Sequence, residues 1–160
     1  MIELIKKSME PVSQTFGMMV HRQSDAAGHP SVVFANATTL LKVTVDWREL
    51  RPFITIADRH ATDAADADGI RSRTEAPRTV FDVDDILLAR MPVPTAPGPV
   101  GKMIGPGGEE SAALLLSEYA LALKVYAGDV LSGDFQIFDK LRTIVNQRER
   151  NIRKKRHGPS

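Results

Sequence analysis

Apolar and polar residues alternate along the stretch from Leu40 to Asp58. Every second position of its first half is apolar, and these positions are Leu41, Val43, Val45 and the chain's single tryptophan, Trp47. A period of two is typical of a strand that buries one face and exposes the other. After a polar turn at 48–51 the alternation resumes around Ile54 and Ile56. We therefore expect two paired strands here, at the centre of a sheet.

Two more strands are predicted upstream, at 18–24 and 31–36. The segment between them contains Gly28 and Pro30, which favour a turn. Because short links join all four strands, an antiparallel meander in sequence order is the simplest topology. The expected sheet is thus four-stranded and antiparallel.

An amphipathic helix is predicted at the start of the chain, with apolar positions at Ile2, Ile5, Met9 and Phe16. Pro11 should break or restart this helix, because its ring displaces a backbone hydrogen bond. Residues 81–90 predict a short helix with Asp82 as its N-cap, and a strand is the alternative.

The C-terminal part predicts two helices. The first spans 109–131, and Leu114, Leu121 and Val125 widen its apolar face, so we expect burial on most sides. A three-residue link at 132–134 leads to the second, whose apolar positions are Ile137, Phe138, Leu141, Ile144 and Val145. Such a short link predicts an antiparallel helical hairpin. Together with the N-terminal helix, this hairpin would cover the inward face of the sheet.

Two segments lack any apolar period. Residues 59–79 are polar and predict a loop, while 92–108 holds five of the ten prolines and five of the eleven glycines. We interpret 92–108 as a long loop inside one α+β domain that spans 1–147. A basic tail follows at 148–160, where an extension of the last helix is expected as far as Arg156.

The composition of the chain argues against several classes of protein. Cysteine is absent, which excludes disulfides, cysteine zinc sites and thiol catalysis and favours a reducing compartment. The first residues lack the apolar core of a signal peptide, and no apolar stretch reaches the roughly 18 residues of a membrane span. We expect a cytoplasmic chain without membrane association. Residues 148–160 carry a net charge of +5 and the preceding 147 residues a net charge of −4.

Acidic residues in the polar loop have part of the spacing of an EF-hand calcium site. Asp66, Asp68 and Glu75 would be ligands, with Gly69 at the invariant glycine position. The first ligand position would fall on Ala64, which has no side-chain oxygen. We therefore expect neither a metal nor another cofactor.

No catalytic group is predicted with any specificity. Asp58 and His60 follow the last predicted strand, a place where enzymes put catalytic residues. Neither has a recognisable nucleophile, since the chain has no cysteine and no serine in a Gly-x-Ser-x-Gly turn. The prediction is a non-enzymatic protein, and an enzyme using Asp58 and His60 is the alternative.

Two surfaces are candidates for partner binding. Polar residues on the outward face and turn of the central strands suit another protein, and they are Lys42, Thr44, Asp46, Arg48, Glu49 and Arg51. We expect an immunity protein, an inhibitor or an adaptor, whose partner is a toxin or an assembly subunit. The alternatives are a subunit of a phage-like or secretion assembly, or nucleic-acid binding through the tail. The tail residues concerned are Arg148, Arg150, Arg153, Lys154, Lys155 and Arg156.

Two groups of short runs carry a family resemblance. They are VFAN at 33–36, VTVDWR at 43–48 and PFITI at 52–56, then YA at 119–120, YAGDVLSGDF at 126–135 and FDKL at 138–141. Together they resemble small bacterial α+β proteins of actinobacterial type, which look like polymorphic-toxin immunity proteins. The resemblance covers about half of the chain. It implies a binding protein and transfers no catalytic residue.

Overall fold

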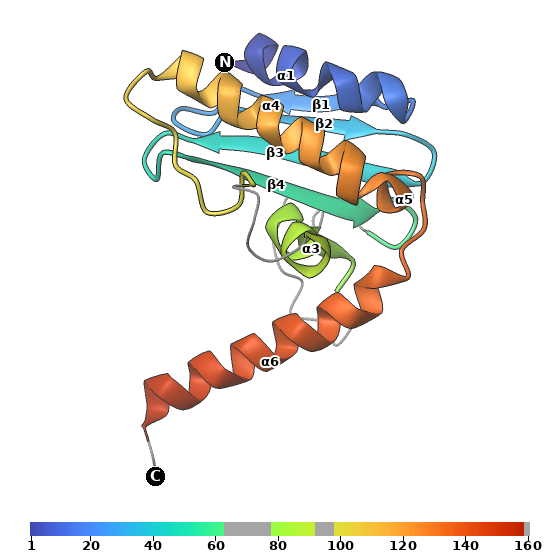
Figure 1. The fold of residues 1–160 in the computed structure, drawn as a ribbon, viewed down its shortest axis with the longest axis vertical. Coiled ribbons are helices and arrows are strands. Elements are labelled where there is room, and N and C mark those ends of the chain that lie inside the picture. The colour runs from blue at the N-terminus through green and yellow to red at the C-terminus, as the bar shows by residue number, and fades with distance from the viewer. Residues whose placement is uncertain (63–77, 92–97, 159–160) are drawn as a thin grey trace.

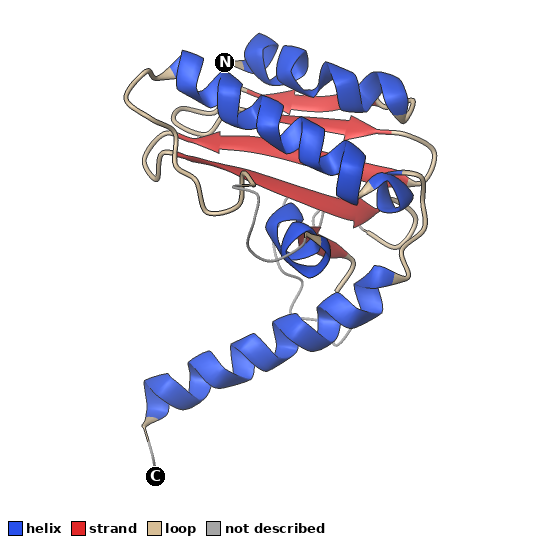
Figure 2. Cartoon of the chain, viewed as in Figure 1, coloured by secondary structure: helices blue, strands red, loops and turns tan. Residues whose placement is uncertain are grey.

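The computed structural model describes residues 1–62, 78–91 and 98–158. Within them the chain forms a five-stranded antiparallel sheet with its strands in sequence order (Figures 1 and 2). The elements are α1 (Ile2–Thr15), β1 (Met19–Ser24), β2 (Ser31–Ala35), β3 (Thr39–Asp46), β4 (Arg51–Asp58), β5 (Val80–Asp82), α3 (Val83–Arg90), α4 (Glu109–Tyr126), α5 (Gly128–Leu131) and α6 (Ile137–His157). The predicted α+β class and antiparallel meander are confirmed.

The predicted number of strands was one too few. The added strand, β5, pairs antiparallel with β4 and places Phe81 opposite Ile56. It has three residues, which is too short for an alternating pattern to show in the sequence. The helix expected at 81–90 is present as α3, and Asp82 is its N-cap residue, although the side chain makes no capping hydrogen bond.

One face of the sheet carries the core. Neighbouring strands align a row of buried apolar side chains across it, namely Phe34, Leu41, Ile56 and Phe81. Helices α1 and α4 lie side by side over this face, with their N-terminal ends together (Figure 1). The amino group of Met1 lies 4.0 Å from the Glu109 carboxylate at that end. The expectation that helices before and after the long loop cover the sheet is therefore correct for the N-terminal helix and for the first of the two C-terminal helices.

Helix α1 runs through Pro11 without a break, contrary to the prediction. Pro11 is exposed, so the Lys7 carbonyl that loses its partner lies on the solvent side, where water can satisfy it. The Pro11 carbonyl still accepts a hydrogen bond from the Thr15 hydroxyl at 2.7 Å. Gly17 follows the helix with a φ of 60°.

The predicted helical hairpin does not form. Helix α6 lies well apart from α4, on the far side of α3 (Figure 1). The start of α6 packs against β5, an edge strand of the sheet, where the rings of Phe138 and Phe81 lie 4.5 Å apart. The short helix α5 redirects the chain, and a sequence pattern of apolar positions does not specify that change of direction. A short link alone therefore does not keep two helices side by side.

Asn36 anchors this redirected segment to the sheet. Its side-chain amide donates hydrogen bonds to the carbonyls of Phe16 at 3.1 Å and Leu131 at 2.8 Å. Its side-chain oxygen accepts hydrogen bonds from the backbone N–H groups of Thr38 and Thr39. One side chain thus joins the end of α1, the β2–β3 turn and the end of α5.

Part of the segment 92–108 packs into the molecule. The Ile104 side chain is buried in the main core, and its backbone N–H donates to the Leu50 carbonyl at 2.6 Å. Residues 63–77, which include the acidic positions Asp66, Asp68 and Glu75, lie outside the described residues.

Candidate functional site

The outer side of α4 carries a stripe of exposed aliphatic side chains. Leu114, Leu121 and Val125 are 65%, 65% and 63% exposed. At 3.6 residues per turn, these positions fall within about 40° of one another around the helix. They point away from the sheet, because Leu116 and Leu123 on the opposite side are buried. We call these three residues the α4 stripe.

The stripe overturns the prediction that this helix is buried on most sides. Apolar residues occur around most of α4, but the helix is part of a single layer over the sheet, so one side remains in water (Figure 1). Ser117 and Glu118 are also exposed and border the stripe. Glu118 is held by an ion pair with Lys102 over 2.6 Å. The sequence showed an unusually apolar helix, but it did not show how many layers cover it.

The outward face of the sheet is less open than expected. Val33, Ala35, Leu40 and Ala57 form a second buried cluster there. Lys42 and Thr44 lie on this face and are half-buried. Partial burial lowers the pKa of Lys42, and the charge of Arg22 adds to this effect. These two residues therefore do not form a freely exposed binding surface.

The other predicted partner-binding residues lie at the β3–β4 turn, where Asp46, Glu49 and Arg51 make side-chain contacts. The Asp46 carboxylate accepts hydrogen bonds from the backbone N–H groups of Arg48 and Glu49 at 2.8 and 3.2 Å. The Arg51 guanidinium lies 4.2 Å from the centre of the Phe53 ring. Arg48 and Glu49 are exposed. The six predicted residues thus divide between the sheet face and the turn.

This turn also contains a residue with an uncommon backbone conformation. Leu50 has a φ of 51°, which branched side chains rarely adopt. Its carbonyl accepts the hydrogen bond from Ile104, so the loop that follows α3 holds the turn in place. This hydrogen bond helps to hold Leu50 in its uncommon backbone conformation.

Asp58, a residue of the alternative enzyme site, contacts backbone groups of the turn that follows β4. The Asp58 carboxylate accepts hydrogen bonds from the backbone N–H groups of His60 and Ala61, at 2.9 and 3.3 Å. Arg59 donates to the Asn36 carbonyl at 2.5 Å. Asp58 caps a turn at the end of β4, and no contact joins its carboxylate to the His60 imidazole among the described residues.

Acidic residues gather at the start of α3. The Tyr119 hydroxyl donates a hydrogen bond to Asp84 at 2.7 Å, and burial together with this bond raises the pKa of Tyr119. Removal from water, and then the charges of Asp85 and Asp84, raise the pKa of Asp82. Asp85 is 9% exposed and accepts a hydrogen bond from Arg148. These contacts join α3 to α4 and α6.

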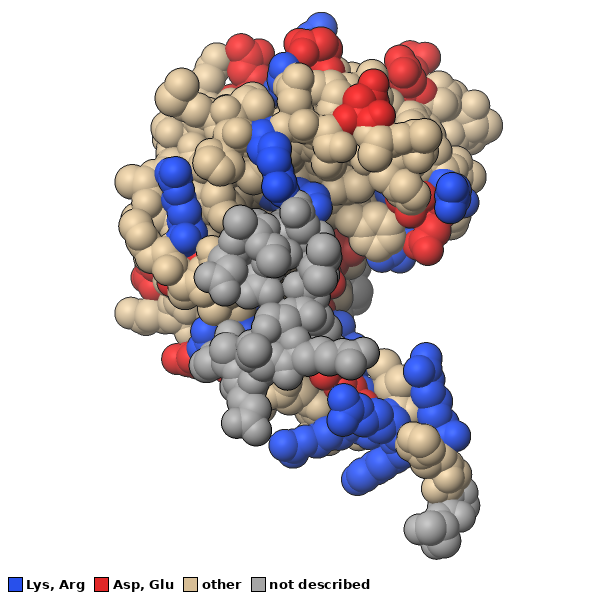
Figure 3. All heavy atoms as spheres, turned by 180° about the vertical axis from the view of Figure 1, so that it is seen from behind, with Lys and Arg blue, Asp and Glu red and all other residues tan. Residues whose placement is uncertain are grey.

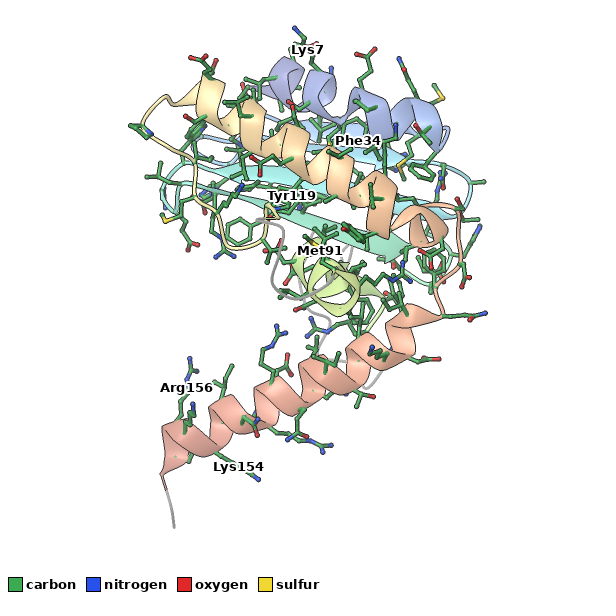
Figure 4. The ribbon with its side chains drawn as sticks, in the orientation of Figure 1. Lys7, Phe34, Met91, Tyr119, Lys154 and Arg156 are labelled. Carbon is green, nitrogen blue, oxygen red and sulfur yellow. The ribbon has the colours of Figure 1, made fainter. Side chains whose placement is uncertain are left out.

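Helix α6 ends in an exposed basic segment. Its residues from Arg150 onward extend beyond the body, where Lys and Arg side chains gather (Figure 3). Lys154 and Arg156 leave the helix on opposite sides in Figure 4. The expected continuation of the last helix into the basic tail is confirmed.

A shallow open depression of about 280 Å³ lies between α1 and the β1 edge of the sheet. Its lining includes Lys6, Lys7 and Phe34, of which Figure 4 labels the last two. The carboxylates of Glu3 and Glu10 also line it, and Lys6 pairs with Glu3 at 2.8 Å.

In the described part of the chain, no group of three or more histidine, aspartate or glutamate side chains is arranged to hold a metal ion. None of the described helices has the length and apolar character that crossing a membrane requires.

In comparisons with known proteins, no family model, no curated protein and no solved structure matches this chain. The resemblance to immunity proteins therefore stays a prediction.

Proposed function

We propose that this chain is a non-enzymatic protein-binding module, and that its partner packs an amphipathic helix against the α4 stripe. The observation that carries the proposal is the exposure of Leu114, Leu121 and Val125 along one line of a single helix. Single exposed aliphatic residues are ordinary on protein surfaces. Several exposed apolar side chains grouped on one surface are a feature of protein interaction sites.

Burial of the stripe would contribute favourably to association with a partner. Each of its side chains would gain roughly 1 to 2 kcal/mol on burial, at about 25 cal/mol per Å² of apolar surface. We expect the stripe to contribute little to the stability of the free chain, because α4 buries other leucines, among them Leu116 and Leu123, in the core. The contribution of the stripe would therefore appear in binding.

A helix is the occupant that fits the stripe best. Leu114, Leu121 and Val125 stand at i, i+7 and i+11, which is one nearly straight line about 16 Å long. Side chains in such a line pack between the side-chain ridges of a second helix that crosses at a small angle. Ser117 and Glu118 would form part of the polar rim that usually surrounds an interface core.

We infer that the module acts as an immunity protein, an inhibitor or an adaptor. The resemblance to polymorphic-toxin immunity proteins supports this role. The net charge of −4 over residues 1–147 would favour a basic partner such as a toxin. We assign the cytoplasm as the compartment, which the absence of cysteine supports.

Capture from a native lysate with matched variants tests the proposal. The stripe variant is Leu114→Gln with Leu121→Gln. The control is Leu88→Gln with Met103→Gln, which removes two side chains that are 61% and 63% exposed elsewhere. A partner should bind the wild-type chain and the control and be lost, by at least about tenfold, with the stripe variant. Equal capture by all three chains contradicts a role for the stripe.

A further inference from the structure

Helix α6 consists of an anchored half and a free half. Val145 is its last buried residue, and the half-buried Glu149 pairs with Arg78 at 2.9 Å. From 150 to 157 every residue is exposed. We call residues 150–157 the basic arm, which is about 12 Å long at 1.5 Å per residue.

The two halves of α6 differ in how their cations are paired. In the anchored half, Arg142 pairs with Asp139 and Arg148 pairs with Asp85. The basic arm carries five cations, which are Arg150, Arg153, Lys154, Lys155 and Arg156. None of them forms an ion pair with another residue that the structure describes.

The basic arm places like charges next to one another. Arg150 stands three and four residues before Arg153 and Lys154, which are neighbouring positions on a helix. Such pairs repel one another, and all residues of the arm are exposed. Cations near a helix C-terminus interact favourably with the helix dipole, which compensates in part. A polyanion bound to the arm would remove the remaining repulsion.

The cations surround the helix and do not form a single face. At 100° per residue, Lys154 and Arg156 point to nearly opposite sides, as Figure 4 shows. An acidic protein surface would contact one side of such a helix and leave the other cations in water. A nucleic acid groove has phosphates on both sides. The major groove of a duplex is about 12 Å wide and admits an α-helix of about 10 to 12 Å diameter.

We propose that the basic arm binds the phosphate backbone of a nucleic acid duplex without sequence preference. The acidic body stays outside the groove, because the arm projects from it (Figure 3). This activity is separate from protein binding by the α4 stripe, which lies on another element.

Titration of a fluorescent duplex of about 20 base pairs with the full chain, at salt concentrations from about 50 to 200 mM, tests the proposal. The logarithm of the binding constant should fall with the logarithm of the salt concentration with a slope of about −4.5, for five phosphate contacts. The variant Arg153→Gln, Lys154→Gln, Lys155→Gln should reduce this slope to about −1.8. The control Lys7→Gln, Lys124→Gln, Lys140→Gln removes three exposed cations from other positions and should leave the slope unchanged.

Three results would overturn the proposal. One is the absence of binding by the wild-type chain at about 50 mM salt. Another is an equal loss of binding in the two triple variants, which would indicate attraction to the surface as a whole. The third is binding of a glutamate-rich peptide as tightly as the duplex, which would identify an acidic protein surface as the ligand. Circular dichroism of each variant checks that the chain is folded.

Discussion

Arg148 donates a hydrogen bond to the Asp85 carboxylate over 2.7 Å, and this contact fixes the position at which α6 leaves the body. Asp85 is 9% exposed, whereas half of the Arg148 side chain is in water. The bond to Asp85 raises the pKa of Arg148, since it favours the charged guanidinium. Close to this pair, α6 passes from the part that packs on the body to the exposed basic arm at 150–157.

Replacement of Arg148 by methionine should destabilise the fold by about 1 to 2 kcal/mol, because it leaves a nearly buried carboxylate without its partner. Asp85→Asn alone should also destabilise. The double variant should lose less unfolding free energy than the sum of the two single losses, since neither partner then remains without the other. Urea unfolding of the four chains measures the coupling, and strict additivity would show that the pair does not hold α6.

Asn36 should be among the polar residues most sensitive to substitution. Asn36→Asp replaces an amide that donates to the carbonyls of Phe16 and Leu131 with a carboxylate that would repel them. We expect a loss of about 2 to 4 kcal/mol, and a smaller loss for Asn36→Ala, which leaves the carbonyls unpaired but not repelled. Thermal unfolding shows which of the two variants is less stable. Equal stability of the aspartate variant and the wild type would contradict this role.

The pair between Arg90 and Asp129 should make stability depend on acid pH. The Arg90 guanidinium donates to Asp129, with one contact at 2.6 Å, and this holds the pKa of Asp129 below its usual range. A depressed carboxyl pKa stabilises the folded state above the unfolded-state value of about 3.9. That contribution disappears as the pH falls through the lower folded-state pKa.

Asp129→Asn should therefore be less stable than the wild type by about 0.5 to 1 kcal/mol at pH 7, a modest value because both side chains contact water. The difference should shrink toward zero below about pH 3.9. Urea unfolding of both chains at several pH values measures this difference in stability. A difference that persists unchanged into strong acid would indicate lost packing and not a lost ion pair.

The two sides of α4 should respond differently to substitution. Leu114→Ala and Leu121→Ala should each change the free energy of unfolding by less than about 0.5 kcal/mol, since both side chains are exposed. Leu116→Ala and Leu123→Ala, on the buried side, should each cost about 2 to 5 kcal/mol. Chemical denaturation of the four variants compares the same substitution on the same helix. A large loss at Leu114 or Leu121 would place the stripe in the core of the chain.

The sequence was sufficient for the parts of the fold that depend on local periodicity. The alternation at Leu41, Val43 and Val45 gave the buried face of β3, and all three side chains are fully buried. The strand β5 was missed, because three residues cannot show a period. Pro11 was expected to interrupt α1, and whether a proline interrupts a helix depends on which side of it faces water.

The candidate sites were harder to predict from the sequence than the fold, because the exposure of their residues depends on tertiary structure. The α4 stripe appeared in the sequence as part of a helix apolar on most sides, because periodicity does not tell which side a second layer covers. The Lys42 and Thr44 face was expected to be open, and a buried cluster that includes Leu40 and Ala57 shares it. The basic arm was visible as a run of charge, but its projection from the body required the position of α6.

Site-specific cross-linking would detect a partner bound at the α4 stripe. A photoreactive phenylalanine analogue at position 121 would report what contacts the α4 stripe in cells, and the same analogue at the exposed Lys140 position is the control. We predict a covalent adduct with one other protein from position 121 and none from position 140. An adduct with a second copy of this chain, an equal pattern from both positions, or no adduct from position 121 would contradict the proposed binding of a partner helix.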